Sequence, residues 1–101
     1  MTSQGSAYGR FRRALKNSQV FQAELAAREM RFVNLADALR LVELYAKCEP
    51  AKFERAALRW FARYIDEIGP SLLQAQMALA ALSDLRSGNP KAGELLAEFA
   101  A

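Results

Sequence analysis

Residues able to carry out acid–base or nucleophilic chemistry are scarce in this sequence. It contains no histidine, the commonest general base and metal ligand near neutral pH. The single cysteine, Cys48, is followed by Glu49, a setting that does not favour the thiolate. The acidic residues are spaced like surface charges of helices, and no glycine-rich phosphate loop is present. We therefore predict no catalytic, cofactor-binding or metal site, no enzymatic activity and no small-molecule substrate.

Basic residues are the other chemically distinctive group, and they begin near the N-terminus. Residues 1–16 contain four of them and no acid: Arg10, Arg12, Arg13 and Lys16. Basic side chains that neutralise phosphates release counterions, so this arm is suited to nonspecific nucleic-acid binding or to an anionic membrane surface. The same segment is equally suited to an amphipathic first helix whose apolar side packs on the domain. Both interpretations stay open at this point.

A second basic group lies in the helix predicted over 50–68. On the side of this helix away from its aromatic face, the helical spacing gathers Lys52, Arg55, Arg59 and Arg63. A stripe of this kind can follow a phosphate backbone. Charge on the outer face of a helix is usually just solvated, and we favour that interpretation. Nucleic-acid binding through both basic groups requires that they share one surface.

The run 22–43 is the one place where a helix-turn-helix motif could lie. Met30 occupies the turn position where glycine is usual, and Arg31 stands where an apolar residue is expected. The candidate recognition helix, 35–48, is mostly apolar, whereas a helix that reads the major groove presents polar side chains near its N-terminus. The sequence therefore disfavours this motif.

Wide apolar helix faces favour contact with another protein. Two sets of residues are candidates for such an interface: Leu41 and Leu44 beside the main apolar stripe of 35–48, and Leu95, Leu96 and Phe99 in the last helix. A homodimer would cover both. We therefore predict a non-enzymatic protein-interaction module that binds another protein or itself. The alternative is a nucleic-acid-binding accessory protein that uses the two basic groups.

The elements that position these residues are all predicted to be α-helices. Alanine and leucine, both strong helix formers, dominate the apolar residues, and β-branched residues are few. Five helices are expected, or six if the first basic segment is separate: about 8–16, 19–31, 35–48, 50–68, 71–86 and a short one from 90. Their short connections favour antiparallel hairpins, in a compact bundle or a short solenoid-like array.

Capping residues set the predicted helix ends. Asn34 and Ser71 have the side chains and spacing of N-caps, and Asn89 has the same role before the last helix. Pro50 suits the first turn of a helix, where a missing N–H costs nothing. Gly69 precedes a proline and marks a helix end.

The chain is predicted to be one helical domain, 8–101, after a flexible tail, 1–7. No apolar run approaches the ~20 residues of a membrane span, and the N-terminus lacks the apolar core of a secretory signal. A single cysteine cannot form an internal disulfide, which favours a reducing, cytoplasmic location.

Three segments resemble small uncharacterised helical proteins of actinobacteria: AELAARE (23–29), LADALRLVELYA (35–46) and FERAALRWFARYIDE (53–67). They belong to helices rich in Ala, Leu and Arg, and they cover the middle of the chain. The excess of arginine over lysine fits a genome of high GC content. The resemblance implies a bacterial cytoplasmic protein, and it implies neither an activity nor any site residue.

Overall fold

The computed structural model describes residues 6–101, which form six α-helices and no strand. The helices are α1 (Ala7–Lys16), α2 (Val20–Glu29), α3 (Leu35–Cys48), α4 (Pro50–Ile68), α5 (Leu72–Arg86) and α6 (Pro90–Ala100). The prediction of an all-α fold is confirmed, with the first basic segment as a separate helix. Of the predicted tail 1–7, residues 1–5 lie outside the described part. Ser6 caps α1 and Ala7 begins it.

Local sequence signals account for the helix ends. The side chains of Asn34, Ser71 and Asn89 each accept a hydrogen bond from a backbone N–H of the helix that follows. Gly69 has a φ of 63° at the end of α4, a left-handed conformation that glycine adopts without steric cost. Ser18 also has a positive φ, 54°, where the chain turns between α1 and α2.

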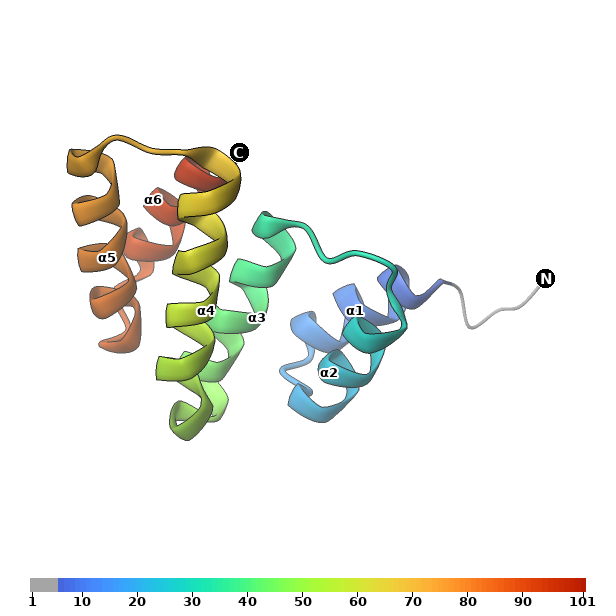
Figure 1. Cartoon of the computed structure of the whole chain (residues 1–101). Helices are drawn as coiled ribbons and strands as arrows, with labels where there is room; N and C mark the ends of the chain where they lie inside the picture. The colour runs from blue at the N-terminus through green and yellow to red at the C-terminus, as the bar shows by residue number, and fades with distance from the viewer. Residues whose placement is uncertain (1–5) are drawn as a thin grey trace.

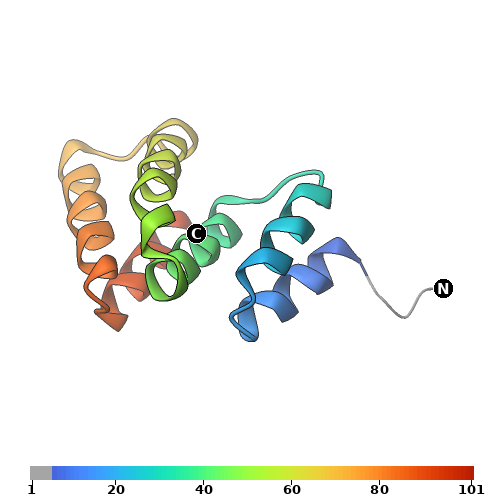
Figure 2. The ribbon, with the colours of Figure 1, turned by 90° about the horizontal axis from the view of Figure 1, so that it is seen from below.

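The helices form three successive hairpins, α1–α2, α3–α4 and α5–α6, and α3 packs against all five other helices. The bundle is therefore organised around α3. Figure 1 shows α1 and α2 at one end of the molecule and α5 at the other, and Figure 2 shows the same order from below. The molecule measures 47 × 26 × 21 Å, so these two ends lie far apart.

The main core lies between α3, α4, α5 and α6. Trp60 and Tyr64 of α4 are fully enclosed there, and their rings stack at a centroid distance of 5.4 Å. The Trp60 Nε1–H donates a hydrogen bond of 2.8 Å to the backbone carbonyl of Leu35, which fixes the start of α3 against α4. The Tyr64 hydroxyl is buried and has no hydrogen-bond partner within residues 6–101. Burial raises the pKa of Tyr64.

A second, smaller cluster holds the α1–α2 hairpin. Its buried side chains are Phe11, Ala14, Ala23 and Ala26 from α1 and α2, together with Leu44 from α3. Apart from their contacts with each other, α1 and α2 pack mainly against α3. This hairpin is therefore attached to the rest of the bundle mainly through α3, whereas α4, α5 and α6 share the main core.

Candidate functional site

The predicted protein interface requires a correction. The structure buries Leu44 and Leu96, which are only 5% and 0% exposed, so neither is available to a partner in this fold. Leu41, Leu95 and Phe99 are partly buried and pack against the main core. The physical reason is the central place of α3. A helix that contacts helices on several sides needs a wide apolar arc for its own fold, and α6 uses its apolar residues to close the main core.

The largest exposed apolar surface lies on α5. Leu72, Leu73, Met77 and Leu79 are 80%, 66%, 42% and 46% exposed, and we call these four residues the α5 face. The buried side of α5 is formed by smaller or more C-terminal residues, Ala78, Ala81, Leu82 and Leu85. The segment 68–83 contains no Asp, Glu, Lys or Arg. This helix is thus apolar on all sides although it lies at the edge of the bundle (Figure 1).

The sequence of α5 indicates an unusually apolar helix, but helical periodicity alone did not identify the α5 face as exposed. Leucine and methionine occur all around α5, a pattern typical of a helix that is covered on every side. Only the position of α5 at the end of the molecule shows that its outer side is uncovered.

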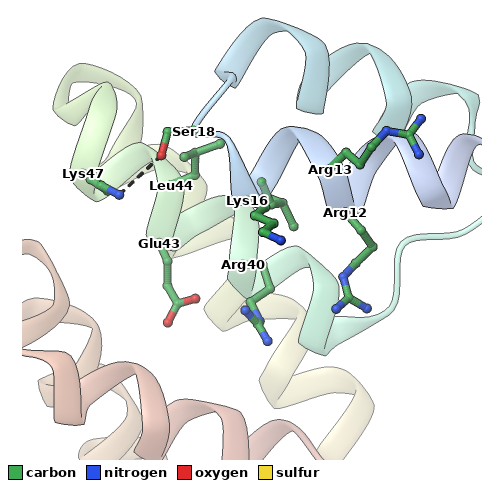
Figure 3. A pocket seen from close by; sticks show the side chains of 9 residues that line it. Arg12, Arg13, Lys16, Ser18, Arg40, Glu43, Leu44 and Lys47 are labelled. Carbon is green, nitrogen blue, oxygen red and sulfur yellow. Dashed lines mark hydrogen bonds between the residues drawn. The ribbon is translucent and has the colours of Figure 1, made fainter.

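The two predicted basic groups lie on different sides of α3. Figure 3 shows Arg12, Arg13 and Lys16 of α1 lining a pocket together with residues of α3, among them Arg40 and Lys47. The bases of α4, Lys52, Arg55, Arg59 and Arg63, line a separate groove of about 880 Å³. The α3 residues of that groove include Ala38, Leu41 and Tyr45. At about 100° per residue, these lie on the opposite side of α3 from Arg40, Glu43 and Lys47.

Two of the four α4 bases are held in ion pairs. Arg63 pairs with Glu67 at 2.7 Å, and Lys52 pairs with Glu24 at 3.0 Å. Arg55 is exposed and makes no ion pair within the described residues. Since carboxylates already neutralise half of the stripe, its positive field is weaker than the sequence suggested.

Glu24 is the centre of a polar contact that ties α2 to α3 and α4. Its Oε2 accepts a hydrogen bond of 2.5 Å from the Tyr45 hydroxyl and one of 3.0 Å from Lys52 Nζ. The Tyr45 hydrogen bond is the main reason that the pKa of Glu24 is lowered. Burial, followed by the same hydrogen bond, raises the pKa of Tyr45. The three side chains are one another's partners and come from three helices, which is typical of a structural contact.

The pocket between α1 and α3 gathers the densest positive charge of the described chain. We call it the α1–α3 pocket; its volume is about 500 Å³, and it is lined by Arg12, Arg13, Leu15, Lys16, Ser18, Arg40, Glu43, Leu44 and Lys47. Five of these side chains are basic and one is acidic. Lys47 Nζ donates to Ser18 Oγ at 3.3 Å, and Arg12 Nη1 donates to the Tyr8 hydroxyl at 2.9 Å. Burial raises the pKa of Glu43, and nearby Arg40 partly opposes that effect.

Arg10, the remaining base of the N-terminal group, does not line this pocket. It forms an ion pair with Glu29 of α2 across the α1–α2 hairpin. Arg13 also lines a second pocket, between α1 and α2, together with Arg10. To the bases of the α1–α3 pocket the structure adds Arg40 and Lys47. Sequence reasoning missed these two because they belong to a different helix.

Within 6–101, no group of His, Cys, Asp and Glu side chains is placed to hold a metal ion. None of the helices there is long and apolar enough to cross a membrane. Comparisons of the chain with protein-family models, with curated proteins and with solved structures find no match.

Proposed function

We propose that this protein is a non-enzymatic helical interaction module that self-associates through the α5 face. The observation that carries the proposal is a set of four exposed, large apolar side chains spread over the outer half of α5, with no charged residue in the segment 68–83. Exposed apolar surface of this kind is unfavourable in water and is commonly covered by a protein partner.

The exposed area is sufficient for a dimer. Ile65 and Ile68, at the end of α4, are 40% and 41% exposed and precede α5 in the chain. Together with the α5 face they present on the order of 500 Å² of apolar surface, within the range of the largest, often functional, patches on monomers. Two copies would bury roughly 1,000 Å² of it, which reaches the size expected of a specific interface.

The absence of charge supports a second copy of this chain as the partner. In a two-fold dimer the same patch contacts itself, so any charged side chain near the axis meets its own copy and is repelled. The segment 68–83 avoids that penalty because all its residues are neutral. A partner bound by complementary charge would instead require ionised groups on this surface.

Sedimentation velocity over a wide protein concentration range tests the proposal. We expect the native chain to dimerise as concentration rises and Leu73→Glu to stay monomeric, because each interface would bury two unpaired carboxylates. Leu72→Glu serves as a second variant. Phe21→Glu is the matched control, since Phe21 is 63% exposed on α2, at the other end of the molecule.

Two results would overturn the proposal. One is a native chain that remains monomeric at the highest concentration. The other is a Phe21→Glu variant that dissociates as strongly as Leu73→Glu. Circular dichroism of each variant shows whether its helices are intact, so a folding defect is not mistaken for a lost interface.

The nucleic-acid alternative has less support. It required the two basic groups to act on one surface, and they line separate pockets on opposite sides of α3. A bacterial, cytoplasmic setting is part of the main proposal. The cytoplasmic part is supported by the exposed Cys48, which has no second cysteine in the sequence to pair with.

A further inference from the structure

We propose that the α1–α3 pocket binds a small ligand that carries linked phosphate groups, such as a diphosphate. This inference departs from the sequence-based expectation of no small-molecule ligand. It also goes beyond the proposed self-association, because the pocket is lined by residues of α1, α3 and the turn at Ser18, and not by the α5 face. The carrying observation is that two helices far apart in the sequence bring Arg12, Lys16 and Arg40 into one space, with Lys47 also in the lining.

The gathering of these charges is a feature of the fold. Arg40 and Lys47 lie two turns apart on one side of α3, facing Lys16 of α1. Figure 3 shows Arg12, Lys16 and Arg40 projecting into the same space, while Arg13 extends along α1 away from them. Like charges held close together repel one another, and a bound polyanion removes that cost. The pocket therefore offers an anion positive charge from two helices.

Glu43 offsets only part of the positive charge of the pocket, chiefly at Arg40. It is the only acidic side chain in the lining, and Figure 3 shows its carboxylate at the edge, apart from Arg12 and Lys16. The same side chain lies against α6, where a Cβ on Gly93 would collide with the carboxylate. Because Glu43 is turned toward α6, the bases in the middle of the pocket keep their positive field.

The shape and lining favour a compact phosphate ligand over a nucleic acid. A volume of about 500 Å³ falls in the range of small-molecule sites, roughly 300–1,000 Å³. No aromatic side chain lines the pocket, so there is no platform on which a base could stack. Leu15 and Leu44 are the apolar side chains of the lining, and neither is aromatic. Arginine and lysine are the side chains best suited to phosphate oxygens.

The test is isothermal titration calorimetry of the full chain with pyrophosphate, at low and moderate salt. Parallel titrations with inorganic phosphate, a nucleoside diphosphate and a single-stranded DNA oligomer distinguish the possible sources of phosphate. We expect pyrophosphate and the nucleoside diphosphate to bind with similar affinity, inorganic phosphate to bind more weakly, and binding to weaken with salt. Similar affinity for the two diphosphates would mean that the protein recognises phosphate and not the base.

Charge-removing variants locate the site. Arg40→Gln and Lys16→Gln should each weaken pyrophosphate binding about tenfold, the usual effect of losing a charge-assisted contact. Arg55→Gln is the matched control because Arg55 is an equally exposed arginine on the other side of α3. Glu43→Gln should tighten binding, since it removes the only negative charge from the lining.

Three results would overturn the inference. Pyrophosphate could fail to bind at low salt, or its affinity could fall equally in Arg55→Gln and Arg40→Gln. Alternatively, single-stranded DNA could bind far more tightly than pyrophosphate and depend on Arg55 as well as Arg40, which would establish the nucleic-acid function instead. Thermal melts of each variant, followed by circular dichroism, confirm that the compared proteins are folded.

Discussion

Leu44→Ala should detach the α1–α2 hairpin from α3 without unfolding the main core. Leu44 is 5% exposed and is the only buried member of the second cluster that α3 supplies. The other members, such as Phe11, belong to α1 and α2 themselves. Truncating this one side chain therefore removes the principal apolar contact through which the hairpin is attached.

The magnitude follows from the atoms removed. Replacing leucine by alanine deletes three buried carbon groups, at about 0.8 kcal/mol each, or roughly 2.4 kcal/mol of transfer free energy. A rigid cavity adds to this cost, and buried Leu→Ala changes reach about 5 kcal/mol in well-packed cores. The α1–α2 hairpin packs mainly against α3 and is able to move toward it, so the cavity is small. We expect a loss of about 2–3 kcal/mol in the free energy that holds the hairpin in place.

Hydrogen exchange resolved by segment measures this loss where it occurs. Amides of α1 and α2 should exchange much faster in Leu44→Ala, while those of α4, α5 and α6 keep nearly their native protection. Leu96→Ala is the control, because Leu96 is 0% exposed in the main core and its truncation should speed exchange in the other helices as well. Equal loss of protection in all six helices of Leu44→Ala would refute the two-cluster interpretation.

Two further predictions concern single buried groups. Tyr64→Phe should raise the free energy of unfolding by about 1 kcal/mol in urea titration, because it removes a buried hydroxyl that has no partner within residues 6–101; a lower value would mean that the hydroxyl is hydrogen-bonded. Burial raises the pKa of Glu43, so the folded state binds its proton more tightly than the unfolded chain does, and stability falls as pH rises through the folded pKa. Glu43→Gln should therefore raise Tm at neutral pH, and the gain should disappear below the ordinary carboxyl pKa of 4.5. An equal gain in Tm at neutral pH and below pH 4.5 would contradict this prediction.

The helices were predictable from the sequence because their signals are local. Asn34 and Ser71 cap the next helix with their own side chains, and Gly69 ends α4 through its own backbone. Each of these interactions spans only a few residues. The sequence window that contains the residue therefore also contains its partner.

The candidate sites were less predictable because they depend on which helices become neighbours. Helical periodicity showed that Leu44 is on an apolar face of α3, but it could not show that α1 and α2 cover that face. In the same way, Arg40 joins the bases of α1 only because the fold places α1 beside α3. Tertiary packing, which no short window records, determines both outcomes.

The two proposed surfaces are formed by different helices, α5 for the dimer and α1 with α3 for the pocket, so we expect them to act independently. A dimer formed through α5 would leave the residues that line both α1–α3 pockets outside the interface. Leu73→Glu should then abolish dimerisation and leave pyrophosphate affinity unchanged, whereas Arg40→Gln should do the reverse. If dimerisation altered the affinity of the pocket for pyrophosphate, the α5 face and the α1–α3 pocket would have to communicate through α3, the helix that contacts all the others. Titrating pyrophosphate into monomeric Leu73→Glu decides between these outcomes.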